Sequence, residues 1–367
     1  MANLIDYVAW RGDLCFDAAP WNEADALLLA TLSYLTFHGM DDARGWTLAE
    51  AKRLELLQDS TDTYFPERKK MFLAMADSPR FGDVRMSHFI SVTDEAQEMQ
   101  FSAACFDLPD GTLCVAFRGT DNSLIGWRED FNMSLLKPVP AQEAAVYYLI
   151  NAAKMDSRGI RIVGHSKGGN LAAYAAANAP AEVQDRILEA FSFDGPGMSP
   201  TVFASEGYRR IVPKIRSYVP QTSIVGMMME YHREYTVVRS SAAGIQQHDP
   251  LTWQVYGPRF ERAEEIDETA RTISDTLHDW LNLSDEKQRA AFLQAAYQMI
   301  ESTRATTVSE IMAEKIKTLR SVVAGSRDLD PEQKKQFNKL TALFFSAGMG
   351  NVIEHVLPRR PEENQES

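Results

Sequence analysis

Residues 164–168 read G-H-S-K-G, and the segments on either side give this short pattern a structural meaning. The stretch before it, 159–163, is short and largely β-branched and apolar, which predicts a buried parallel strand. Residues 169–179 are rich in alanine and end before Pro180, which predicts a helix. A serine between glycines on a sharp turn from strand to helix is typical of a nucleophile elbow. We therefore expect Ser166 Oγ to stand above a sheet and the first backbone N–H groups of the helix to point at an oxyanion.

Composition limits the classes of function that such a chain can have. Its 367 residues are enough for one large domain or for a domain with an appendage. The net charge of −13 argues against binding to nucleic acid or to anionic lipid surfaces. No cluster of histidine, cysteine and carboxylate has metal-ligand spacing, and no dinucleotide or Walker glycine pattern follows a strand, so no cofactor is expected.

The first residues of the chain, its hydropathy and its cysteine content indicate the cellular compartment. The first residues lack the basic and apolar regions of a signal peptide, and no stretch is long and apolar enough to span a membrane. The cysteine count of three is low and odd, which favours reduced thiols. These features predict a cytoplasmic location.

Changes in hydrophobic pattern and polarity along the sequence divide it into four parts. Residues 1–80 are helical in pattern and are expected to form a cap segment. Residues 81–258 alternate strands and helices. Residues 259–357 are predicted to be a helical appendage, whose first helix covers 259–283, and residues 358–367 a polar, disordered tail.

The middle part carries the pattern of a mostly parallel sheet flanked by helices. Strands are expected at 86–92, 99–106, 112–118, 159–163, 187–193, 215–219 and 234–238, and a helix at 141–155. Such α/β sheets bind ligands at the carboxyl ends of their strands. The expected fold class is therefore α/β, with the α/β-hydrolase fold as its core.

A nucleophilic serine needs a histidine base, which follows the serine in chains of this type. His248 lies in a loop beyond the last expected core strand, where such a base belongs, and we favour it. His232, in a polar stretch before that strand, is the alternative. His278 and His355 fall on expected helices of the appendage and are assigned to packing or surface.

The acid that orients the base is less clear from the sequence. Asp194 directly follows an apolar strand and begins a turn rich in glycine and proline, so it is placed to reach the base from beside the nucleophile. The same residue could instead order that turn through an Asx hydrogen bond. Glu230 and Asp249 are the alternatives, and Asp249 is the weaker because it adjoins His248.

An oxyanion hole requires two backbone donors. The N–H of Lys167, directly after the nucleophile, is one candidate. Thr120 is the other, because it follows an apolar strand and Gly119 in a turn.

Two motifs together resemble the signature of the class 3, or fungal-type, lipases. Residues 117–120 read F-R-G-T and are followed by G-W-R-E-D-F at 126–131, and residues 164–169 read G-H-S-K-G-G. The similarity covers roughly residues 85–255, and the chain looks like an uncharacterised bacterial branch of these lipase-like hydrolases. The resemblance implies Ser166 as nucleophile, His248 as base and Thr120 as oxyanion donor.

The chain departs from that family at two places. The family's acid commonly follows the next strand in a D-x-V-P context, whereas residues 219–226 contain no carboxylate, so Asp194 becomes the substitute. Lys167 replaces a usually apolar residue. Its side chain is expected to lean to solvent or to pair with Asp130 or Asp194, although a cation there could also favour an anionic substrate or alter the stabilisation of an oxyanion.

The leading hypothesis is a serine hydrolase that cleaves a small ester, a lipid ester or a thioester through an acyl-serine intermediate. Met227 and Met228 would pack in the core or line the acyl site. An acyltransferase with the same triad, and a non-catalytic binding module on a hydrolase fold, are the rival readings. A carboxylate within hydrogen-bond reach of His248 Nδ1 would favour an enzyme.

Overall fold

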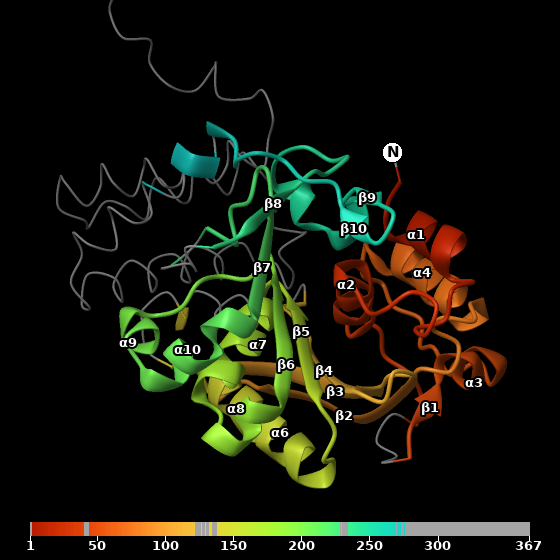
Figure 1. The fold of residues 1–367 in the computed structure, drawn as a ribbon, viewed down its shortest axis with the longest axis horizontal. Coiled ribbons are helices and arrows are strands. Elements are labelled where there is room, and N and C mark those ends of the chain that lie inside the picture. Colours follow the sequence, from red (N-terminus) through yellow and green to blue (C-terminus); the bar gives the residue numbers. More distant parts are fainter. Residues whose placement is uncertain are drawn as a thin grey trace, which may run out of the picture.

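An eight-stranded sheet forms the centre of the computed structural model (Figure 1). The structure describes residues 2–39, 44–121, 126, 129, 132–133, 138–227, 229, 234–268, 270–272 and 275. The strands lie side by side in chain order, from β1 at one edge to β8 at the other. A mostly parallel sheet with helices on both sides confirms the α/β fold class expected from the sequence.

The sheet is antiparallel at its start and parallel from β4 onward. β1 to β4 (Trp46–Thr47, Arg85–Asp94, Met99–Asp107 and Leu113–Phe117) pair antiparallel, with short connections from β2 to β3 and from β3 to β4. β5 to β8 (Ile160–His165, Ile187–Phe193, Ile215–Pro220 and Thr236–Val238) continue parallel to β4. The carboxyl ends of β5, β6 and β7 therefore share one edge, which is where Ser166 and Asp194 emerge.

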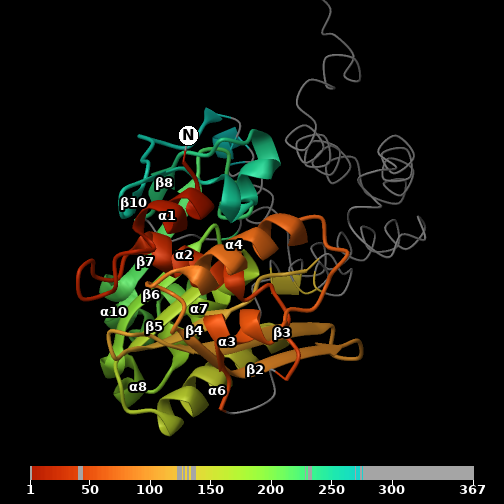
Figure 2. The same ribbon diagram turned by 90° about the vertical axis from the view of Figure 1, so that its right-hand side faces the viewer.

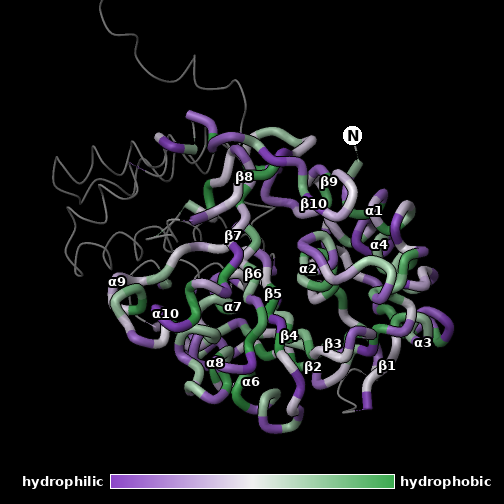
Figure 3. The backbone as a smooth tube through the Cα atoms, in the orientation of Figure 1, coloured by the Kyte–Doolittle hydropathy of each residue, from purple (hydrophilic) through white to green (hydrophobic). Residues whose placement is uncertain are grey.

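Two helical layers cover the two faces of the sheet (Figures 1 and 2). One layer consists of α6 to α10 (Pro140–Met155, Lys167–Asn178, Ala181–Arg186, Pro200–Phe203 and Glu206–Ile211). The other consists of α1 to α4 (Leu4–Arg11, Glu23–Leu32, Leu48–Arg53 and Phe65–Asp77). Alternate residues of β4 enter the two cores, Cys114 and Ala116 on the α1–α4 side and Val115 on the other, as the two-residue period of a strand requires. Figure 3 shows the hydrophobic residues concentrated along the central strands.

The N-terminal segment is bound tightly to the sheet. Every residue of α2 after Glu23 is buried, and the helix packs against β5. Asn22 caps its first turn, since the side chain accepts from the N–H groups of Ala24 and Asp25. The segment expected to be a cap thus forms the second helical layer of the main core.

The end of the described chain differs from the sequence expectation. The helix predicted from residue 259 does not begin there, because Arg259–Phe260 forms strand β10, paired with β9 (Val255–Tyr256). Gly257, at a φ of +59°, supplies the reversal between them, and Phe260 packs edge-on against Phe193 and Trp253. Two short 3₁₀ helices, η2 (Gly244–His248) and η3 (Pro250–Thr252), precede this pair of strands, and η1 (Val212–Lys214) lies between α10 and β7. Nearly all of the predicted appendage and tail lies outside the described residues.

Candidate active site

Ser166 sits on a sharp turn between β5 and α7. Its backbone has φ of +59° and ψ of −133°, a conformation that non-glycine residues rarely adopt. The flanking glycines have a steric reason, since a Cβ on Gly164 would lie 1.9 Å from Gly168 O and one on Gly168 2.2 Å from Phe117 O. The backbone N–H of Ser166 donates to Phe193 O at 2.9 Å, which ties the turn to the end of β6. The strand, turn and helix predicted around residues 164–168 are all present.

Asp194 and His248 are joined by a hydrogen bond. Asp194 Oδ2 lies 2.6 Å from His248 Nδ1, with the carboxylate 1% exposed and the imidazole 26% exposed. The other carboxylate oxygen accepts from the Ser223 hydroxyl and from the N–H of Gly226. All of these donors converge on a buried carboxylate, as its burial requires.

The backbone of Asp194 is held in a strained position. Its φ is +48°, and its N–H donates to Tyr218 O of β7 at 2.7 Å. Aspartate tolerates the left-handed region better than most residues. The turn after β6 therefore aims the carboxylate at His248, across the edge of the sheet.

His165 links the turn of Ser166 to the loop that carries His248. Its Nε2 lies 2.8 Å from the backbone O of His248 and its Nδ1 3.0 Å from the Tyr34 hydroxyl. A carbonyl can only accept, so the proton belongs on Nε2 and Tyr34 donates to Nδ1. The imidazoles of His165 and His248 lie with centroids 4.6 Å apart. Burial, and then the neighbouring His248, hold the pKa of His165 well below its usual value.

His165 and Tyr34 are site residues that sequence reasoning missed. His165 lies inside the G-H-S motif, which is a usable signal. No sequence signal pointed to Tyr34, which belongs to the N-terminal helical layer.

The Ser166 hydroxyl makes no hydrogen bond to His248, although the His248 imidazole lies beside His165, the residue directly before Ser166. Within the part of the chain that the structure describes, the Ser166 side chain is 8% exposed and its hydroxyl has no partner. In structures without substrate, such contacts are often long and tighten on binding.

The turn after β4 lies against Ser166. A Cβ on Gly119 would lie 3.0 Å from Ser166 Cβ and 2.6 Å from His165 O, so only glycine fits. Thr120 follows this contact directly. The N–H of Lys167 belongs to the first turn of α7, where backbone donors have no partner within the helix. Both predicted oxyanion donors thus lie on segments adjoining Ser166.

The Lys167 side chain is not where the sequence placed it. It is 1% exposed rather than solvated, and its Nζ donates to Glu129 Oε2 and Gln100 O, each at 2.9 Å. Of the two aspartates expected to pair with Lys167, Asp194 is hydrogen-bonded to His248 instead, and Asp130 lies outside the described residues. The lysine turns inward because Glu129 supplies a buried countercharge.

The alternative triad members divide into two groups. His232 and Glu230 lie outside the described residues, as do His278 and His355. Asp249 is described, and its carboxylate accepts from the N–H of Leu251. Burial raises its pKa.

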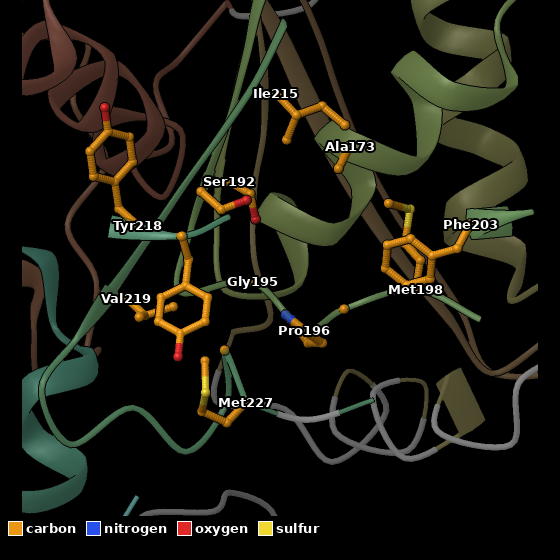
Figure 4. Close-up of a pocket in the computed structure, with 14 residues that line it drawn as sticks. Ala173, Ser192, Gly195, Pro196, Met198, Phe203, Ile215, Tyr218, Val219 and Met227 are labelled. Carbon is orange, nitrogen blue, oxygen red and sulfur yellow. The ribbon is translucent and has the colours of Figure 1, made fainter. Parts of the chain in front are cut away.

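Met227 is buried in a pocket beside the turn that carries Asp194 (Figure 4). Gly195 and Pro196 form one wall, with Met198 and Phe203 close by (Figure 4). Ser166 and His248 do not line this pocket. Met228 lies outside the described residues, so an acyl-binding role for this methionine pair stays a prediction.

The described residues contain neither a metal-ligand cluster nor a helix able to span a membrane. No three histidine, cysteine or carboxylate side chains there are grouped as a metal site. No helix there has the length and hydropathy needed to cross a membrane.

Known proteins resemble this chain at two levels. The model of the Mbeg1-like family matches residues 75–298, more than half of the chain. Among solved structures, M37 lipase is 16% identical, with a TM-score of 0.36 over 56% of this chain and 69% of that chain. A triacylglycerol lipase from Penicillium expansum is 12% identical, with a TM-score of 0.34 over 51% of this chain and 77% of that chain. No curated protein matches the chain.

Proposed function

We propose that this chain, which belongs to the Mbeg1-like family, is a serine hydrolase that cleaves a carboxylic ester through an acyl-serine intermediate. One observation carries the proposal. A buried carboxylate, Asp194, is hydrogen-bonded to Nδ1 of His248, and the imidazole lies beside the strained turn of Ser166. A serine, a histidine and a carboxylate in these relative positions form the constellation that activates a hydroxyl nucleophile.

In the proposed mechanism, Ser166 Oγ attacks the ester carbonyl while His248 Nε2 accepts the hydroxyl proton. Asp194 keeps the proton of the imidazole on Nδ1 and stabilises the imidazolium that forms. His248 then returns its proton to the leaving alcohol, which leaves an acyl-serine. Water, activated by the same imidazole, releases the acid and restores Ser166.

The oxyanion of each tetrahedral intermediate would be held by two backbone donors. Lys167 contributes the N–H at the start of α7, where the helix dipole also favours negative charge. Thr120 contributes from the turn after β4. Small esters, lipid esters and thioesters all share this carbonyl chemistry, so the proposal extends to each of them.

Labelling with a fluorophosphonate tests the proposal directly, because this probe phosphonylates only an activated serine. Intact-mass spectrometry of the full chain should show one adduct, which is lost in Ser166→Ala and in His248→Ala. Ser157→Ala is the matched control, since Ser157 is exposed and precedes β5, at the opposite end of that strand from Ser166. The control should label like the wild type.

Turnover of p-nitrophenyl esters of graded chain length then measures the reaction itself. Ser166→Ala should lose on the order of a millionfold in kcat. A folded wild-type protein that neither labels nor turns over any ester would refute the proposed function, as would an adduct that persists in Ser166→Ala.

A further inference from the structure

Lys167 and Glu129 form a buried ion pair behind the nucleophile turn. Their side chains are 1% and 0% exposed, and Lys167 Nζ lies 2.9 Å from Glu129 Oε2. Taking both charges out of water has a large desolvation cost, which apolar residues of similar volume would avoid. Packing alone therefore does not explain this pair, and its geometry indicates a more specific role.

Glu129 is fixed by donors from three separate segments. Oε2 accepts from Lys167 Nζ of α7 and from the N–H of Gln100 in β3, at 2.9 Å each. Oε1 accepts from the N–H of Ala141, in the first turn of α6, at 2.9 Å. The carboxylate therefore locks the start of α7 to a sheet strand and to a neighbouring helix.

Gln100 extends the same network to the other side of the site. Its backbone O accepts from Lys167 Nζ, and its side-chain Oε1 accepts from the N–H of Asp121 at 3.3 Å. The side chain is also packed against the loop, since a Cβ on Gly126 would lie 2.3 Å from Gln100 Oε1. Asp121 adjoins Thr120. Gln100 therefore restrains both the loop that carries Thr120 and the side chain of Lys167, the two residues that supply the proposed oxyanion donors.

We propose that Lys167, Glu129 and Gln100 are positioning residues that set the spacing between the two backbone donors of the oxyanion hole. This inference rests on the proposed function. The Lys167 ammonium faces the protein interior, so it acts through the backbone it anchors and not on the substrate. Oxyanion donors must lie within a few tenths of an ångström of their best position, and misplacement by about 1 Å costs on the order of a hundredfold.

The test uses Lys167→Met, Glu129→Gln and the double variant of the full chain. Sites are counted by titration to completion with a fluorophosphonate, so that kcat refers to folded, reactive protein. Each variant should lose on the order of 10- to 100-fold in kcat, with KM changed less than about twofold. The Ki of a trifluoromethyl ketone, which forms a tetrahedral adduct, should rise by the same factor as kcat/KM falls.

The double variant separates positioning from stability. Lys167→Met leaves Glu129 buried without a countercharge, whereas the double variant removes both charges and should recover most of the lost thermal stability. Its kcat and Ki should stay impaired. Arg80→Lys is the matched control, because it weakens another fully buried pair, with Asp25, away from the oxyanion segments. It should lower stability and leave kcat per site unchanged.

Two experimental outcomes distinguish failure of the positioning role from failure of the proposed function. Wild-type kcat and Ki in the double variant, in a wild type that labels and turns over esters, would overturn the positioning role alone. A wild type that neither labels nor turns over esters would overturn the proposed function, and this inference with it.

Discussion

His165 should make the stability of this protein depend on pH in a predictable direction. Its imidazole is buried, donates through Nε2 to the His248 carbonyl and accepts at Nδ1 from Tyr34, so the folded state holds it neutral. Burial lowers its pKa well below the ordinary value. The unfolded chain, in contrast, protonates this histidine near pH 6.5. Below that pH the unfolded state binds more protons, and the free energy of unfolding must fall as the pH falls.

The size of the effect follows from the unfolded-state pKa alone while the folded imidazole stays neutral. With a pKa of about 6.5 for the unfolded chain, protonation stabilises the unfolded state by about 0.1 kcal/mol at pH 7.5 and by about 1.4 kcal/mol at pH 5.5. Each further pH unit adds about 1.4 kcal/mol until the folded state also protonates. Burial also raises the pKa values of Asp249 and Asp25, so these carboxyl groups stabilise the folded state as the pH falls, opposite to His165. The contribution of His165 must therefore be isolated as the difference between the wild type and a variant that lacks this histidine.

Urea unfolding of the wild type and of His165→Gln at pH 7.5, 6.5 and 5.5 provides that difference. Glutamine does not titrate, and its Nε2 can still donate to the His248 carbonyl. The wild type should lose about 1.3 kcal/mol more than the variant between pH 7.5 and pH 5.5. Parallel curves for the two proteins would refute the reasoning, because they would mean that His165 is protonated equally in both states.

Two further predictions concern the site. Asp194→Asn should lower kcat on the order of 10⁴-fold, less than Ser166→Ala, because asparagine cannot hold the Nδ1 proton of His248 as a carboxylate does. Ester turnover per titrated site measures this loss, and a rate near wild type would place the acid elsewhere. Gly119→Ala should lower the free energy of unfolding by about 1–3 kcal/mol and impair turnover, because the added Cβ would lie 2.1 Å from the Tyr34 hydroxyl. An unchanged midpoint of urea unfolding would contradict this steric clash.

Local sequence patterns predicted the parts of the fold that depend on local chemistry. The run 187–193 is apolar and ends at a glycine and proline turn, and β6 covers these same residues. The G-H-S-K-G turn was predictable because glycine is required wherever backbones approach as closely as Gly164 and Gly168 do. The strand at 259–260 was missed because the aromatic contacts that hold it, from Phe260 to Phe193 and Trp253, join residues far apart in the chain.

Side-chain partners were harder to predict than backbone elements. The sequence suggested solvent or an aspartate for Lys167, yet its partner is Glu129. Adjacent carboxylates in one short motif cannot be ranked without knowing which of them faces the core. Tyr34 shows the same limit, because its contact with His165 spans 131 residues of chain. Asp194 stood out only because it directly follows a strand, a place where the fold itself restricts the direction of a side chain.

The burial of α2 has a consequence for the boundaries of the folding unit. The family match begins at residue 75, yet the sheet face carrying Ala116, Val163 and Phe193 is covered by helices that precede it. A fragment starting at residue 75 would leave that face open to water and remove the tyrosine that holds His165. The minimal unit that can fold, and that can build this candidate site, is therefore larger than the unit that sequence similarity defines. Its first seventy residues are as much a part of that unit as the strand that leads to Ser166.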